Sequence, residues 1–227
     1  MVVAIVALIG AVLSAVIAVY GQLRSTSLMR RREAEAVLAR YREPLVGAAY
    51  ELQGRLYNIL ELNFLQKYYV GGDEAQKDYA LRNTLYVVGQ YFAWSEILRR
   101  EIQFLSFSDS ERTRVVADRQ RRILEVFQSD DPDLGGPFLV WRGEQRAIGE
   151  LMIDRDEGPV QCIGYAKFLQ RNEPSFQRWF TRLETDIAEV ASGPNRRITE
   201  LQHALVDLIR ELDPEALRYS DEVLRKV

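Results

Sequence analysis

The polar segment best suited to chemistry holds four charged residues: Arg142, Glu144, Arg146 and Glu150. On a helix, Arg142, Arg146 and Glu150 share one row, because residues four apart lie on the same face. Two arginines on one row can hold a carboxylate or a phosphate through their planar guanidinium groups. The same spacing also makes an ordinary ladder of ion pairs, and no glycine-rich phosphate loop accompanies it. We favour the structural interpretation and keep ligand binding as the alternative.

Polar residues also interrupt the two most apolar segments of the chain. They are Glu51, Arg55, Asn58 and Glu61 in the first segment, and Asn83, Gln90, Glu96 and Arg99 in the second. If both segments are central helices, some of these groups must be buried and paired, because an unpaired buried polar group is costly. Asn58 and Asn83 mark the best position for a small-molecule pocket. Its walls would be aromatic: Tyr57, Tyr86, Tyr91 and Trp94. The competing interpretation is a hydrogen-bond network that fixes how the helices pair.

The single histidine and the single cysteine narrow the chemistry further. His203 shares a helical face with Thr199 and Asp207, so we expect it to be solvated rather than to act as a general base. Cys162 lies among apolar residues and is expected to pack as a small hydrophobe. One cysteine excludes a disulfide within the chain, and one cysteine with one histidine excludes a Cys/His zinc site. We predict no metal site, no cofactor and no catalytic residue.

The elements that position these residues are predicted to be helices, because apolar residues recur at helical spacing almost throughout. The expected helices are residues 27–42, 44–69, 74–107, 108–128, 143–153, 160–170, 174–190 and 196–212, with a short one opening at Asp213-Pro214. Pro44 should separate the first two of these helices, since proline breaks a helix interior and fits a first turn. Asp73 and Gln76 resemble a capping pair for the third. The fold class is therefore all-α, with residues 44–227 forming a multi-helix bundle.

Residues 1–20 contain no charged side chain and form the predicted transmembrane anchor. Twenty residues of helix span roughly 30 Å, which matches the hydrocarbon core of a bilayer. Tyr20 would lie at the interface, where aromatic residues are enriched. A cleaved signal peptide is disfavoured by the missing basic start and A-x-A site. A buried soluble helix is the other alternative.

A basic collar in the juxtamembrane segment, residues 21–43, gives the anchor a direction. The collar consists of Arg24, Arg30, Arg31 and Arg32. By the positive-inside rule the N-terminus lies outside and the bundle lies in the cytoplasm, and the same arginines can contact anionic lipid head groups. Two rows of small residues on the anchor, Ala7, Ala11, Ala15 and Gly10, Ser14, Ala18, would allow a homodimer.

Composition and missing motifs decide the functional class. The 227 residues carry a net charge of -3, which does not favour nucleic acid as a partner. Arginine outnumbers lysine by 26 to 4, as in proteins of GC-rich bacteria. Walker, Rossmann, kinase, hydrolase and HEXXH motifs are absent. We predict a single-pass protein of the cell membrane that acts as a non-enzymatic interaction or scaffold module, with the bilayer and a protein or second copy as partners. The alternative is a membrane-tethered sensor or enzyme whose polar pocket binds a small anionic ligand.

Overall fold

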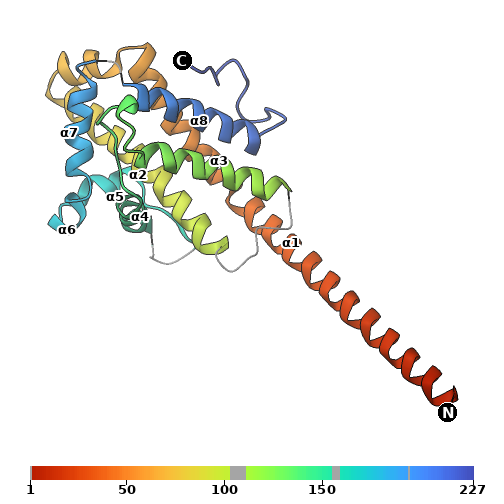
Figure 1. The fold of residues 1–227 in the computed structure, drawn as a ribbon. Helices are drawn as coiled ribbons and strands as arrows, with labels where there is room; N and C mark the ends of the chain where they lie inside the picture. The colour runs from red at the N-terminus through yellow and green to blue at the C-terminus, as the bar shows by residue number, and fades with distance from the viewer. Residues whose placement is uncertain (1, 103–110, 155–158, 194) are drawn as a thin grey trace.

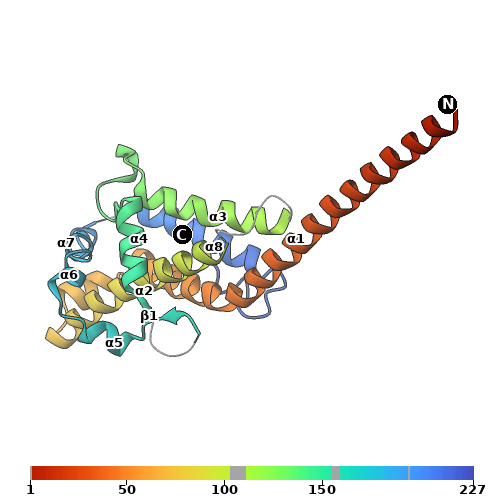
Figure 2. The same ribbon diagram turned by 90° about the horizontal axis from the view of Figure 1, so that it is seen from below.

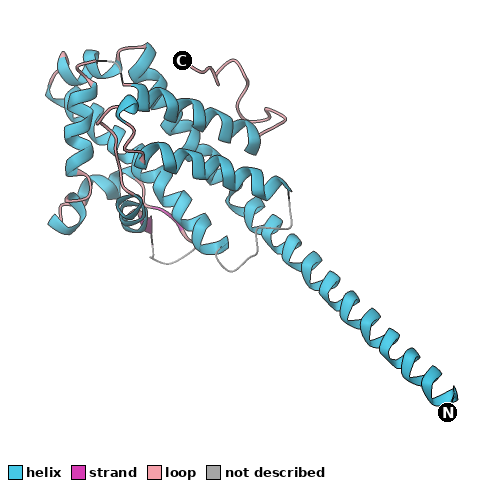
Figure 3. Ribbon diagram, in the orientation of Figure 1, coloured by secondary structure: helices cyan, strands magenta, loops and turns pink. Residues whose placement is uncertain are grey.

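The computed structural model describes residues 2–102, 111–154, 159–193 and 195–227, and at residues 2–13, 15, 27, 30, 31, 34, 102, 112 and 113 it describes the backbone alone. Helices make up most of this part of the chain, and loops and one short pair of strands make up the rest (Figure 3). The predicted all-α fold class is thereby confirmed.

The first element, α1 (Val2–Glu61), is one long helix that projects from a compact bundle (Figure 1). Among the described side chains, Leu38 is the first along α1 to be buried. The predicted helix break at Pro44 is wrong, because Pro44 lies inside α1. Tyr41 and Leu45 are buried on either side of it, so packing holds the helix together where the proline removes a backbone hydrogen bond. Figure 2 shows α1 changing direction where it enters the bundle, as proline-containing helices commonly do.

The end of α1 also differs from the prediction of a helix over 44–69. The helix ends at Glu61, Asn63 follows with φ of 52°, and a short π-helix, η1 (Leu65–Val70), comes next. Asparagine tolerates this left-handed backbone better than most residues do, which suits it to terminating a helix.

Three further helices complete the centre of the bundle: α2 (Glu74–Ile102), α3 (Glu111–Gln128) and α8 (Arg196–Leu212). Helix α1 packs against both α2 and α8, and α3 packs against α8. The predicted capping pair of α2 is confirmed, since Gln76 N donates to Asp73 Oδ1 at 2.8 Å and Asp73 N donates to Gln76 Oε1 at 3.0 Å. Residues 103–107 of the predicted third helix and residues 108–110 of the predicted fourth helix lie outside the described residues.

Helix α4 (Arg142–Leu151) packs against α2 through glycines. A Cβ on Gly149 would lie 2.6 Å from the backbone oxygen of Phe92, and one on Gly89 would lie 3.1 Å from Met152. After α4 the chain forms a small antiparallel pair, β1 (Ile153–Asp154) and β2 (Gln161–Cys162), with Ile153 opposite Cys162. The helix predicted over 160–170 therefore begins with a strand and continues as α5 (Tyr165–Gln170).

The helix predicted over 174–190 is divided into α6 (Pro174–Gln177) and α7 (Thr181–Val190). Phe180 N donates to Gln177 O at 2.8 Å, a tightened turn that brings Phe176 and Phe180 against the ring of Phe168. The loop between α3 and α4 contains one 3-10 turn, η3 (Pro132–Leu134).

The short helix predicted after Asp213 is wrong, because residues 214–227 form turns, bends and irregular chain. The buried carboxylate of Asp213 accepts hydrogen bonds from the backbone amides of Leu217, Arg218 and Tyr219, at 3.2, 2.9 and 3.1 Å. Backbone groups further along bond to α8, where Gln202 Nε2 donates to Arg225 O at 2.7 Å. We call residues 214–227 the C-terminal tail.

Within the described residues, none of the helices is both long and apolar enough to cross a membrane. The predicted anchor and its rows of small residues fall mainly on side chains outside that part of the chain.

Candidate functional site

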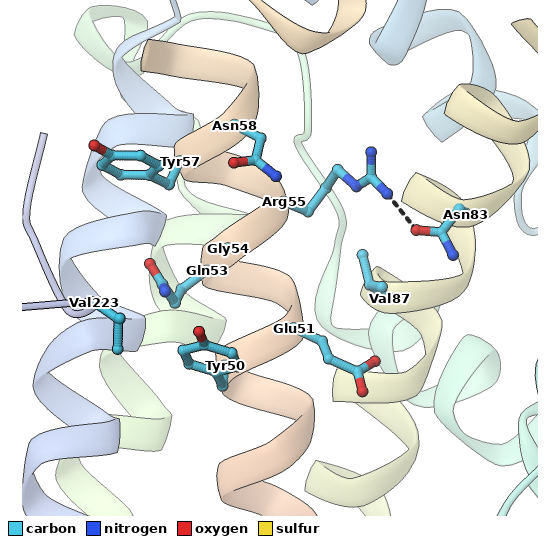
Figure 4. A pocket seen from close by; sticks show the side chains of 10 residues that line it. All are labelled: Tyr50, Glu51, Gln53, Gly54, Arg55, Tyr57, Asn58, Asn83, Val87 and Val223. Carbon is cyan, nitrogen blue, oxygen red and sulfur yellow. Dashed lines mark hydrogen bonds between the residues drawn. The ribbon is translucent and has the colours of Figure 1, made fainter. Parts of the chain in front are cut away.

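An open hollow of about 450 Å³ crosses α1 where the helix passes between α2 and the C-terminal tail (Figure 4). It is lined by Tyr50, Glu51, Gln53, Gly54, Arg55, Tyr57, Asn58, Asn83, Val87 and Val223. A Cβ on Gly54 would meet no atom within 4 Å, so this glycine leaves space at the middle of the hollow. Figure 4 shows Arg55 and Glu51 reaching toward α2, while Tyr57 and Gln53 lie toward α8.

Arg55 is the most unusual residue of the hollow, because its side chain is 8% exposed and still cationic. Its Nη2 donates to Asn83 Oδ1, while its Nη1 is buried without a hydrogen-bond partner. The guanidinium carbon lies 3.9 Å from the centre of the Phe64 ring, within the range of a cation–π contact. Burial lowers the pKa of Arg55, and nearby Tyr79 partly offsets this effect.

Glu51, one helical turn before Arg55, is the acidic group of the hollow. Partial burial raises the pKa of Glu51, and a hydrogen bond with Gln90 partly opposes the rise. Tyr86, whose pKa is raised to about 12 mainly by burial, lies close enough to feel the charge of Glu51. Its hydroxyl donates to Ile163 O at 3.2 Å, so it ties α2 to the chain after β2.

The charged segment of α4 lies apart from this hollow. Glu144 accepts from Trp141 N at 2.8 Å and caps the helix, and Arg146 is exposed. Glu150 pairs with Arg100 of α2 at 2.8 Å, and the expected pair of Arg146 with Glu150 is not formed among the described residues. Arg142 is half-buried.

An ion-pair network stands where α4 meets α2. Buried Glu96 accepts from Arg99 Nε at 2.6 Å and from Arg100 Nε at 2.7 Å. Burial acts to raise the pKa of Glu96, but these hydrogen bonds hold it below its usual value. Glu96 lies roughly 20 Å along the helix axis from Asn83. The structure thus brings Asn58, Asn83 and Arg55 together, without the residues of α4.

The remaining predicted residues are placed as follows. Arg24 and Arg32 are exposed on α1, and the side chains of Arg30 and Arg31 lie outside the described part.

His203 is half-buried rather than solvated, with Nε2 2.5 Å from Val227 O. Burial raises the pKa of the Cys162 thiol to about 12, so the thiol stays protonated at neutral pH. The described residues contain no group of His, Cys, Asp and Glu side chains that could hold a metal ion.

Sequence reasoning missed part of this site. Tyr50 and Gln53 read as ordinary helix positions, and Val223 reaches the hollow only because the tail folds back. One signal was present in the sequence, since Gly54 lies between Glu51 and Arg55, two of the polar residues that interrupt this apolar segment. Fold and site define an all-α bundle with one projecting helix and an open polar hollow. Neither a protein-family model, nor a curated protein, nor a solved structure matches the chain.

Proposed function

We propose that this chain is a single-pass membrane protein whose helical bundle acts as a non-enzymatic interaction or scaffold module at the cytoplasmic face of the cell membrane. The observation that carries the proposal is the continuity of α1, which joins residues 2–20, a stretch without charged side chains, to the bundle in one helix. The bundle leaves apolar side chains on this helix uncovered, among them Ile17 at 70% exposure and Leu23 at 65%. A lipid environment would cover the first of these.

The arginine collar supports the orientation. Arg24 and Arg30–Arg32 follow the apolar segment within a few turns, and such residues are retained on the cytoplasmic side. Near an anionic membrane surface each contributes about 1 kcal/mol of attraction.

The length of helix between the anchor and the bundle supports an interaction role. From Tyr20 to Leu38, α1 spans about 27 Å at 1.5 Å per residue. We call this segment the stalk. A helical stalk of this length holds the bundle clear of the lipid head groups, so a partner can reach its sides.

The charged groups of the bundle support a non-enzymatic module, because the strongest ones are used for packing. Glu96 forms ion pairs with Arg99 and Arg100 of the same helix, α2. The carboxylate of Asp213 binds backbone amides at the start of the tail. Buried Arg197 donates to the backbone oxygens of Val126, Ser129 and Gly135 and so ties α8 to the end of α3.

Anchoring is tested on the full chain, tagged at the C-terminus and expressed in a bacterium, by alkaline carbonate extraction of membranes. The wild type and a control with Leu8→Ile and Val12→Ile should remain in the pellet. Leu8→Arg with Val12→Arg should move to the supernatant, because each arginine costs about 3 kcal/mol at the centre of a membrane helix. Release of the wild type by carbonate would contradict the anchor, and digestion of the tag by protease added to spheroplasts would contradict the orientation.

The interaction role is tested by chemical cross-linking in intact membranes, followed by affinity capture after gentle solubilisation. The expected result is a defined complex, with either a protein partner or a second copy of the chain. Recovery of the chain as a monomer without cross-linked partners would contradict this role and leave the anchor unaffected.

A further inference from the structure

The described residues contain five buried charged side chains: Arg55, Glu96, Asp186, Arg197 and Asp213. Of the two arginines among them, Arg55 is the one that lines the hollow on α1. Glu96 has two arginines, and Arg197, 1% exposed, donates to three backbone oxygens although its Nε has no hydrogen-bond partner. Arg55 donates to the amide oxygen of Asn83 and interacts with Tyr79, but its Nη1 has no hydrogen-bond partner and no carboxylate among the described residues forms an ion pair with it. A buried cation without a counter-charge is destabilising, so its retention beside an open hollow calls for an explanation.

The surroundings of Arg55 fit an anion rather than a cation or a neutral group. Because a guanidinium can only donate hydrogen bonds, Asn83 must turn its oxygen toward Arg55, which leaves its amide nitrogen as a further donor. Asn58 brings a second amide to the same hollow. These groups together offer several donors around a single positive charge.

We propose that the hollow on α1 binds a small organic carboxylate, with Arg55 as its counter-charge and the amides of Asn58 and Asn83 as additional donors. This site goes beyond membrane anchoring and does not depend on it. It corresponds to the alternative function of a polar pocket that binds a small anionic ligand. Arg55 takes the role that the sequence suggested for Arg142 and Arg146 of α4.

The charge balance favours a carboxylate over a phosphate. Glu51 lies in the same hollow, one helical turn from Arg55, or roughly 6 Å between Cβ atoms. Glu51 repels any anion bound at Arg55, but it repels a singly charged carboxylate about half as strongly as a phosphate dianion at the same distance. Val87 of α2 offers a surface for a small apolar body attached to the carboxylate, on the same side of α1 as Arg55 (Figure 4).

The experiment uses the full chain in detergent micelles, titrated with benzoate, benzamide and inorganic phosphate and followed by calorimetry and ligand-observed NMR. Benzamide has the shape of benzoate without its charge. Benzoate should bind with a Kd of about 10 mM or lower, and benzamide at least about tenfold more weakly, which is the effect of one charge-assisted hydrogen bond. Absence of benzoate binding, equal binding of benzamide, or preference for phosphate would each overturn the proposal.

Variants locate the site. Arg55→Met keeps an apolar chain of similar length and should weaken benzoate at least about tenfold. Arg146→Met removes the same charge from the exposed face of α4 and should leave the Kd unchanged.

Gly54→Leu suits a helix and fills the hollow, so it should also abolish binding. If Arg55→Met fails to fold, Gly54→Leu decides the question. Unchanged affinity in Gly54→Leu, or loss in Arg146→Met alone, would place the ligand elsewhere.

Discussion

Arg55 and Arg197 are both buried arginines, but the bundle surrounds them differently. Arg197 donates to three carbonyl oxygens at the junction of α3, α8 and the following loop, so its removal leaves those oxygens unsatisfied. Arg55 has one amide partner and an unpartnered Nη1. Loss of satisfied hydrogen bonds and loss of an uncompensated charge have opposite effects on stability.

We therefore predict that Arg197→Met lowers the free energy of unfolding by about 3 kcal/mol, because several buried acceptors lose their donor. Arg55→Met should stay within about 1 kcal/mol of the wild type, or exceed it, because the unpaired charge is removed. Denaturant unfolding of the full chain in detergent, followed by circular dichroism, measures both. An Arg55→Met variant as unstable as Arg197→Met would show that the contacts of Arg55 with Asn83 and Phe64 outweigh the cost of its buried charge.

Glu96 gives the bundle a defined dependence on pH. Its pKa is lowered in the folded state, so its stabilising contribution is present above the ordinary pKa of 4.5 and is lost as the pH falls through the folded value. Glu96→Gln should lower stability by about 2 kcal/mol at pH 7, since Arg99 and Arg100 are partly exposed and can be rehydrated.

The difference between Glu96→Gln and the wild type should become smaller as the pH falls below 4.5, measured by denaturant titration at each pH. Glu125→Gln is the matched control, because Glu125 is exposed on α3 and its pairing distance to Arg121 is 3.8 Å. The control should change stability by less than about 0.5 kcal/mol at either pH. A constant difference between pH 7 and pH 3 would contradict the assigned role of Glu96.

At the scale of elements, the contact between α2 and α4 depends on the absence of a side chain. Gly149 meets backbone atoms of Phe92, which cannot move aside without bending α2. Gly149→Ala should therefore destabilise the fold by about 2 kcal/mol despite the higher helix propensity of alanine. Gly143→Ala lies on the same helix with nothing within 4 Å, and should be neutral or up to about 1 kcal/mol stabilising. Equal midpoints for the two variants in thermal unfolding would contradict the close approach.

The sequence predicted helices where a wide apolar stripe coincides with a capping signal, as at Asp73 before α2. It failed where tertiary contacts override local signals. Pro44 stays within a helix because Tyr41 and Leu45 are buried on both sides, and Asp213 binds three amides of the tail in place of starting a helix. The hollow was placed near Asn58 and Asn83, but the part played by Val223 depends on how the tail folds back, which no local pattern encodes.

For the whole molecule, the decisive feature is that one helix belongs to both the proposed anchor and the core. The same α1 that projects from the bundle packs against α2 and α8 and carries Arg55 (Figure 1). If the stalk is rigid, the hollow is held at a fixed height and orientation relative to the bilayer. A flexible linker would instead let the bundle tumble freely.

Proline tests this rigidity, because Pro44 is tolerated only where buried neighbours hold the helix on both sides. Thr26 lies in the stalk, is exposed, and donates to Gln22 O at 2.8 Å, so Thr26→Pro should create a hinge that nothing restrains. Spin labels on Ser14→Cys and Arg40→Cys, in a Cys162→Ala background, should give a narrow distance distribution near about 39 Å for a continuous helix. Thr26→Pro should broaden and shorten it, and Thr26→Ala should leave it unchanged. A broad distribution without the added proline would mean that the stalk does not hold the bundle at a fixed position.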